Sequence, residues 1–345
     1  IFLITLFITI TGYSQKYIIQ VKDAEKRKWS YINLKGEYIS SEFYKKCFEN
    51  DESGYAVVFD NRRDQYFFID ENGKILETEI KGFNLKNVLG LGVKGFVDGY
   101  AAVEKKDRWG FIDTEGRLII DCKYEKVNVM NEGLSAVRLD KKWLIIDKNG
   151  NERSPEPKNI EDIRMFIEGA APFKTSEEKM GFLDQNGNIL INPVFDNLGY
   201  FSGGIAWARA SDAKIGYIDK KGNWLIAPQF LSARKFDIES GIARVKTIEG
   251  WIYIDRAGNK LNLNLSNKKK DFSEGLCAGN SGEFYGFYNS ENRWVISPQF
   301  DAVRDFKNGY AAVKKDGLWG IINKKGEWII TPRYLAMKVV EIINY

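Results

Sequence analysis

Hydrophobic and polar positions recur along this chain as one unit of about 35 residues. The unit is clearest at 109–116, where an aromatic residue, a small residue, an aromatic residue and Ile precede Asp-x-x-Gly. The Asp or Asn of this pattern recurs at Asn33, Asp70, Asp113, Asp147, Asp184, Asp219, Asp255, Asn289 and Asn323. Successive spacings lie between 34 and 43 residues. Such a period predicts a repeat architecture in which one supersecondary unit is written nine times.

A residue that tolerates a left-handed backbone follows each of these Asp or Asn residues by three positions. The slot holds Gly36, Gly73, Gly116, Gly150, Gly187, Gly222, Gly258, Asn292 and Gly326. Asn is the other residue that visits positive φ readily, so Asn292 indicates that the slot is conformational. A type I turn followed by a left-handed residue closes a short β-hairpin.

Two further landmarks add a strand on each side of this hairpin. Phe-x-x-Gly-x-Ala-x-Val, as in Phe96 to Val103, precedes the hairpin, and a charged turn joins the two. Ile-x-Pro-x-Phe/Tyr follows it at 191–195, 226–230, 296–300 and 330–334. We expect the Pro to end the third strand, because Pro cannot donate to a central ladder. Each unit is therefore predicted to be a three-stranded antiparallel meander plus a connector.

The predicted fold is all-β, and stacking of neighbouring units would supply the core that one unit lacks. An open β-solenoid or superhelical hairpin array is favoured, as a single array over 15–345 with capping segments at 15–27 and 335–345. A closed β-propeller is the alternative. Propellers typically have four to eight blades of four strands, which nine units of three strands fit less well.

The first residues have the pattern of a signal peptide. Residues 1–10 carry no charge and are apolar apart from two Thr, and the small residues Gly12 and Ser14 follow two apart. We expect residues 1–14 to be the signal peptide, its n-region preceding this sequence, with cleavage leaving Gln15 first. The protein is then exported to the periplasm, the cell surface or the medium. No other apolar run is long enough to predict a transmembrane span in the mature chain.

Composition excludes several kinds of chemistry. The chain has no His, which removes Ser-His-Asp and Cys-His catalysis. With 51 Lys and Arg against 47 Asp and Glu, the net charge of +4 does not predict nucleic-acid binding. Three Cys (Cys47, Cys122 and Cys277) are not a disulfide framework. The acidic residues show no metal-ligand spacing, so no metal or cofactor is expected and the chain is predicted not to be an enzyme.

Three of the motifs resemble a known family. Trp109-Gly110, Trp319-Gly320 and the degenerate Lys28-Trp29 look like the bacterial WG repeat, also called the KWG repeat. The resemblance covers roughly residues 17–335. It implies a β-rich repeat architecture in bacterial proteins that are often exported, and it implies no agreed activity.

A second aromatic column holds Trp224, Trp294 and Trp328, each five residues after its turn Asp or Asn. Cross-strand packing within the hairpin is the simpler interpretation. The other interpretation is that these aromatic side chains are exposed and bind sugar faces or peptides. The overall hypothesis is an exported, noncatalytic scaffold that binds an unidentified protein or glycan at the cell envelope. The alternatives are a polysaccharide-binding array that uses these Trp side chains, and a hydrolase with a carboxylate site on an atypical repeat.

Overall fold

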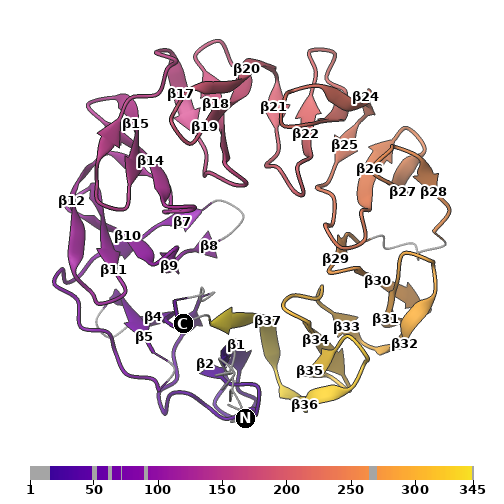
Figure 1. Cartoon of the computed structure of the whole chain (residues 1–345). Coiled ribbons are helices and arrows are strands. Elements are labelled where there is room, and N and C mark those ends of the chain that lie inside the picture. Colours follow the sequence, from indigo (N-terminus) through magenta and orange to yellow (C-terminus); the bar gives the residue numbers. More distant parts are fainter. Residues whose placement is uncertain are drawn as a thin grey trace, which may run out of the picture.

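The computed structural model describes residues 16–48, 53–60, 64–70, 72–88, 92–263 and 270–343. The expected signal peptide, residues 1–14, lies outside the described residues. The described chain is all-β, which confirms the predicted all-β repeat fold, and nine sheets follow one another around a central opening (Figure 1). The protein is therefore a β-propeller with nine blades in its described part.

The first three blades differ from the rest. Blade 1 contains β37 (Ala336–Ile343), β1 (Lys16–Lys22) and β2 (Trp29–Ile32). Blade 2 contains β3 (Lys46–Cys47), β4 (Ala56–Asp60) and β5 (Gln65–Ile69). Blade 3 contains β6 (Asn84–Leu85), β9 (Phe96–Val97), β10 (Tyr100–Lys105), β11 (Arg108–Asp113) and β12 (Leu118–Tyr124). A separate hairpin of β7 (Asn87–Val88) and β8 (Gly92–Val93) lies inside the ring (Figure 1).

Blades 4 to 9 are four-stranded meanders. Blade 4 contains β13 (Lys126–Val127), β14 (Leu134–Leu139), β15 (Lys142–Asp147) and β16 (Glu152–Arg153), and blade 5 contains β17 (Ile160–Ile163), β18 (Ala170–Thr175), β19 (Met180–Asp184) and β20 (Ile189–Phe195). Blade 6 contains β21 (Asn197–Leu198), β22 (Ala206–Arg209), β23 (Ile215–Ile218) and β24 (Trp224–Phe230), and blade 7 contains β25 (Ser232–Ala233), β26 (Ala243–Thr247), β27 (Gly250–Ile254) and β28 (Lys260–Leu261). Blade 8 contains β29 (Phe272–Ser273), β30 (Leu276–Ser281), β31 (Phe284–Tyr288) and β32 (Trp294–Phe300), and blade 9 contains β33 (Ala302–Val303), β34 (Tyr310–Lys315), β35 (Leu318–Asn323) and β36 (Trp328–Tyr334).

The two ends of the chain close the ring, so the favoured open solenoid is wrong and the alternative propeller is correct. β1 pairs with β37 in antiparallel register, with Lys22 opposite Ala336 and Val21 opposite Met337 (Figure 1). The segments 15–27 and 335–345 were expected to cap separate ends, but their described strands, β1 and β37, pair in one blade. Three strong strands are evident in each unit of the sequence, one fewer than a propeller blade has. The strand that completes most blades is only two residues long and lies in the connector.

The last strand of each blade lies at the outer edge of the ring (Figure 1). This placement corrects the expectation that Pro ends the third strand. β36 continues through Pro332 to Tyr334, because an edge strand needs no outward N–H donor at that position. Its pairing with β35 shifts register between the Trp319–Tyr334 and Ile321–Ile330 pairs, so the strand bulges at the Pro.

The bulge explains the Gly of the Trp-Gly pair. A Cβ built on Gly320 would lie 2.4 Å from the carbonyl oxygen of Ile330, and one on Gly216 would lie 2.3 Å from that of Ile226. Such contacts are too short for any side chain. The same close approach occurs at all of Gly110, Gly181, Gly216, Gly286 and Gly320, and these blades carry the seven-residue outer strands β12, β20, β24, β32 and β36. The Gly therefore makes room for the bulged outer strand.

The predicted turn slots have the predicted conformation. The eight Gly slots have φ between 76° and 87°, and Asn292 has φ 61°. In each turn the preceding Asp or Asn side chain holds the loop, as when Asn323 Oδ1 accepts hydrogen bonds from the N–H groups of Lys325 (2.9 Å) and Glu327 (3.0 Å). All nine slots therefore adopt the left-handed backbone conformation.

The hydrophobic core lies between blades. One cluster joins Phe182 and Ile191 of blade 5 to Leu198 and Phe201 of blade 6. The cluster that closes the ring is of the same kind, joining Ile321 and Tyr334 of blade 9 to Ile19, Val21 and Met337 of blade 1. Each blade buries both of its faces against its neighbours, which no single unit could do alone.

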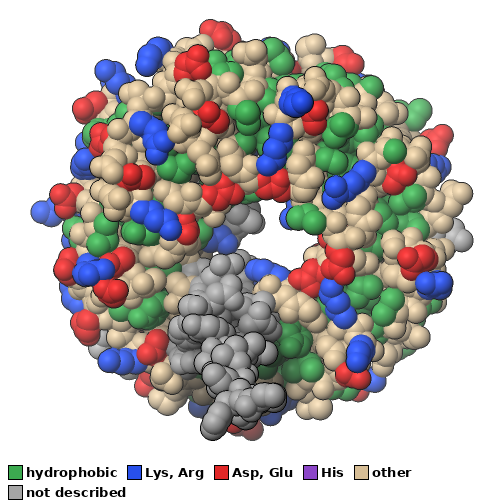
Figure 2. All heavy atoms as spheres, in the orientation of Figure 1, with side chains coloured by type: hydrophobic (Ala, Val, Ile, Leu, Met, Phe, Trp, Pro, Cys, Tyr) green, Lys and Arg blue, Asp and Glu red, His purple; other side chains and the backbone are tan. Residues whose placement is uncertain are grey.

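Carboxylates add polar links between neighbouring blades. Glu132 accepts hydrogen bonds from the N–H groups of Glu168 (2.6 Å) and Gly169 (2.8 Å) of the next blade. Glu168 binds the N–H groups of Gly203 (2.6 Å) and Gly204 (2.9 Å) in the same way. Asp98, Asp237 and Glu274 make related contacts with the following blade. Figure 2 shows acidic side chains along the rim of the central opening.

Candidate functional site

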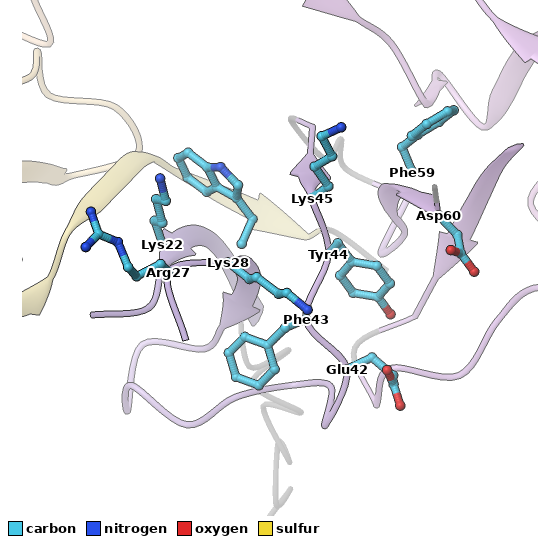
Figure 3. A pocket seen from close by; sticks show the side chains of 10 residues that line it. Lys22, Arg27, Lys28, Glu42, Phe43, Tyr44, Lys45, Phe59 and Asp60 are labelled. Atoms are coloured by element: carbon cyan, nitrogen blue, oxygen red, sulfur yellow. The ribbon is translucent and has the colours of Figure 1, made fainter. Parts of the chain in front are cut away.

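A cleft between blades 1 and 2 is the strongest candidate for a functional site. It has a volume of about 440 Å³ and is lined by Lys22, Arg27, Lys28, Trp29, Glu42, Phe43, Tyr44, Lys45, Phe59 and Asp60 (Figure 3). These side chains come from the end of β1, the β1–β2 hairpin, the connector before β3 and the end of β4. The cleft thus spans the seam between the closing blade and its neighbour.

The β1–β2 hairpin is shaped by Asp23. Its Oδ1 accepts hydrogen bonds from the N–H groups of Lys26 (2.7 Å) and Glu25 (3.0 Å), and its Oδ2 accepts one from the Tyr38 hydroxyl. Burial alone raises the pKa of Asp23, but these hydrogen bonds outweigh it and hold the pKa below the ordinary value. Arg27 takes a left-handed conformation with φ 55°, which turns the chain back into β2. The hairpin therefore presents Arg27 and Lys28 on a defined turn.

The aromatic side chains of the cleft are held by backbone pairing. Trp29 and Tyr44 exchange two backbone hydrogen bonds of 2.9 and 2.8 Å, which fixes the connector against β2. Burial raises the pKa of Tyr44, so its hydroxyl stays protonated and neutral. The Lys26 ammonium lies 3.6 Å from the centre of the Phe43 ring, a cation–π contact. Trp29, Phe43 and Phe59 are half-buried, so the walls are partly solvent-exposed.

The cations of the cleft carry no compensating ion pair. In the part of the chain that the structure describes, no carboxylate lies within ion-pair distance of Lys22, Arg27, Lys28 or Lys45. Some other surface cations of the ring are paired, as Lys179 is with Asp196 at 2.6 Å. The cleft is therefore a concentration of unpaired positive charge beside aromatic side chains.

Lys45 is the residue that distinguishes this seam from its equivalents. Lys46 pairs with Phe59 just as Lys126 pairs with Arg138, so Lys45 occupies the position of Glu125. Three other seams hold an acid there: Glu125, Asp196 and Asp301, whose N–H groups donate to the next blade at 2.8, 3.0 and 2.8 Å. Leu231 and Leu335 hold the position in two more seams. Seam 1–2 thus places a cation where its equivalents place an acid or an apolar residue.

Comparison with protein families agrees with this architecture. The model described as "WG containing repeat" matches residues 109–143, 180–212, 215–250, 285–319 and 319–334. The chain is a WG-repeat protein. The resemblance predicted from the Trp-Gly pairs is confirmed, and the matches fall in blades 3 to 9 of the propeller.

Solved structures resemble the WG-repeat propeller in fold alone. The crystal structure of a eukaryotic initiation factor aligns with a TM-score of 0.62 at 12% identity, over 95% of this chain and 98% of that chain. The computationally designed Ika8 protein aligns with a TM-score of 0.43 at 13% identity, over 80% of this chain and 98% of that one, too low to support an argument. No curated protein matches the sequence.

The three Trp candidates of the second aromatic column lie apart from the cleft, on the outer strands of three blades. Trp224 is 38% exposed, and its ring meets Phe195 of the preceding blade edge-on at 5.6 Å. Trp328 meets Phe300 in the same way at 5.8 Å, whereas Trp294 stacks on Tyr288 at 3.6 Å. All three are packed against another aromatic ring, and the column is not brought together into one site.

The three thiols of the WG-repeat protein are held in an unreactive, protonated form. Cys47, Cys122 and Cys277 are free thiols, and burial raises the pKa of each, to about 12 for Cys277. A thiol with such a pKa is protonated at neutral pH and is a poor nucleophile. Within the described ranges, no group of three or more Cys, Asp or Glu is placed to hold a metal ion. No helix in that part of the chain is long and apolar enough to cross a membrane.

The cleft could not be predicted from the sequence, because residues 15–27 have the pattern of a terminal cap. A signal was nonetheless present. Aligning the units on the last aromatic of the outer strand places Lys45 under Glu125, Asp196 and Asp301. This reversal of charge at one position of the repeat could have marked the seam before the ring closure was known.

Proposed function

We propose that this WG-repeat protein is an exported, noncatalytic scaffold that binds a protein or glycan partner in the cell envelope or outside the cell. The observation that carries the proposal is the seam between blades 1 and 2. There the repeat departs from its own pattern and gathers unpaired cations beside aromatic side chains. Groups of this kind bind ligands by charge and stacking and need no reactive nucleophile.

The chemistry of the thiols and of two inter-blade carboxylates supports a noncatalytic role. Cys277 is buried and Cys47 and Cys122 are half-buried, and all three thiols have raised pKa values. Glu132 and Glu168, which lie on adjacent blades, use both carboxylate oxygens to hold backbone N–H groups. Export is supported by the apolar, uncharged residues 1–10 followed by the small residues Gly12 and Ser14.

Fractionation of the native host cells tests export. An antibody against the propeller should detect the protein in the envelope or medium, and N-terminal sequencing should begin at Gln15. Cross-linking in intact cells should capture an envelope protein or glycan. A cytoplasmic protein that retains residues 1–14 would contradict the proposal, as would release of reducing ends or peptides from a captured partner by the purified protein.

A further inference from the structure

We infer that the cleft between blades 1 and 2 binds an acidic polysaccharide, with Lys22, Arg27, Lys28 and Lys45 holding its anionic groups. This inference rests on the proposed function and deepens it, because it commits to an acidic glycan where the proposed function allows a protein or a glycan. The inference that the ligand is anionic rests on the residues of the cleft alone.

The lining of the cleft is positively charged. Four cationic side chains line the cleft against two carboxylates, Glu42 and Asp60, which gives the lining a formal charge of +2. The four cations have no ion-pair partner within the described residues, so an anionic ligand would not have to displace an internal carboxylate. Cations placed together repel one another, and a bound polyanion relieves that repulsion. The complementary ligand is therefore negatively charged.

Three other seams hold an acid at the position of Lys45. At the position of Lys45, Glu125 lies 3.7 Å from Arg138 and Asp196 lies 2.6 Å from Lys179. Asp301 accepts a hydrogen bond of 2.9 Å from the Gly317 N–H. These acids satisfy cations and donors of their own seams. Lys45 does the opposite, because it adds a cation to a seam that already has three.

The aromatic side chains of the cleft do not favour the stacking of nucleic-acid bases. Nucleic-acid bases bind by stacking on open aromatic faces, but the Lys26 ammonium covers one face of Phe43 at 3.6 Å. Trp29 is half-buried at the start of β2. What the cleft offers is charge beside half-buried aromatic side chains, and the net charge of the chain is only +4. A chain of sugar rings that carries carboxylates or phosphates suits such a surface better than a nucleic acid does.

The test uses the purified protein and polygalacturonate, with neutral dextran, poly-glutamate and single-stranded DNA as comparison ligands. We expect calorimetry to detect binding to polygalacturonate that weakens with salt, and little binding to dextran. Lys45→Glu restores the acid found in the equivalent seams and should weaken binding about tenfold, because it replaces attraction with repulsion at the ligand. Arabinogalactan phosphate in place of polygalacturonate separates phosphate from carboxylate recognition.

The matched control is Lys142→Glu, which makes the same charge change on an exposed residue of the β14–β15 hairpin, outside the cleft. Its affinity should stay within about twofold of the parent, since the residue is remote from the ligand. Melting temperatures of both variants should match the parent. Equal losses of affinity in the two variants would overturn the assignment of binding to the cleft. Tighter binding of poly-glutamate or DNA than of either acidic polysaccharide would overturn the proposal that the ligand is a glycan. If the cleft binds as expected but the host protein is cytoplasmic, the export proposal fails and the charge specificity stands.

Discussion

Glu168 Oε1 accepts a hydrogen bond of 2.6 Å from the backbone N–H of Gly203, a residue of the next blade. The second carboxylate oxygen binds the adjacent Gly204 N–H at 2.9 Å. Glu168 in turn donates its own N–H to Glu132 of the preceding blade. Where the residue before the Gly of Phe-x-x-Gly is acidic, as at Asp98, Glu132, Glu168 and Glu274, it is a latch that links one blade to the next, in addition to the hydrophobic seam.

Removing a latch should destabilise the ring. Glu168→Ala leaves two N–H groups without their carboxylate acceptor. A hydrogen bond to a charged group contributes about 1.5–3 kcal/mol, and water can replace part of that stabilisation in the variant. We expect a loss of about 1–3 kcal/mol in the free energy of unfolding, measured by urea denaturation. Glu168→Gln should fall between parent and Ala, because its amide keeps one acceptor. Glu283→Ala, at an exposed residue, is the control. An equally large loss in its free energy of unfolding would refute the role of Glu168 as a latch.

Much of this fold could be predicted from the sequence, because the repeated turns depend on local chemistry. The Asp or Asn and the left-handed residue three positions later determine each hairpin by themselves. Closure could not be predicted in this way, since it depends on pairing between β1 and β37, which lie more than 300 residues apart. The two-residue strands β13, β21, β25 and β33 have no periodicity to detect.

The Gly of the Trp-Gly pair should not tolerate a methyl group. In Gly216→Ala the new Cβ would lie 2.3 Å from the carbonyl oxygen of Ile226, and neither backbone can move without breaking the ladder. Overpacking of this kind costs about 1–3 kcal/mol, so thermal unfolding should occur several degrees lower. Ser30→Ala changes the equivalent position of blade 1, which already carries a Cβ, and should have a much smaller effect. Similar shifts in the two variants would contradict the proposed reason for the Gly.

The turn slot gives a second backbone test. Gly116 has φ 81°, and a Cβ there would lie 2.1 Å from the Glu77 carbonyl oxygen, so Gly116→Val should cost more than the about 1–2 kcal/mol of a left-handed conformation alone. Asn292→Gly should be neutral or slightly stabilising. Glycine adopts its φ of 61° without strain, and the Asn292 Oδ1 is buried with no partner among the described residues. Differential scanning calorimetry of both variants checks which one is less stable. Equal shifts in melting temperature would contradict the conformational explanation of the slot.

Acid should weaken the turns through their Asp residues. The hydrogen bond from Asn259 Nδ2 (2.9 Å) and those from backbone N–H groups hold the pKa of Asp255 below its ordinary value of 3.8. A lowered folded-state pKa means that this stabilisation is present above the ordinary value and is lost as pH falls through the folded one. The melting temperature of the parent should therefore exceed that of Asp255→Asn near neutral pH, and the difference should shrink as the pH falls through the lowered pKa of Asp255. A difference independent of pH would show that the carboxylate charge is irrelevant.

The candidate site was harder to predict than the turns, because it exists only where the closing blade meets blade 2. Lys22 and Lys28 are ordinary residues of a hairpin in the sequence, and only the ring places Lys45 and Phe59 beside them. The aromatic column was visible in the sequence, but its surroundings were not. Trp224 and Trp328 share a slot, yet the rings that they contact, Phe195 and Phe300, belong to the preceding blades.

The second aromatic column should act in packing and not in recognition. Trp328 is half-buried against Phe300, so Trp328→Ala should lower stability, though by less than the about 3–5 kcal/mol typical of a fully buried Trp. Trp224, at 38% exposed, should lose less on the same change. Both variants should bind polygalacturonate like the parent, because the cleft lies on other blades. The measurement is melting together with binding to a panel of neutral and acidic glycans. If Trp224→Ala, Trp294→Ala and Trp328→Ala all melt like the parent while one glycan loses affinity, the column is a binding surface and the ring carries a second glycan site on its outer edge.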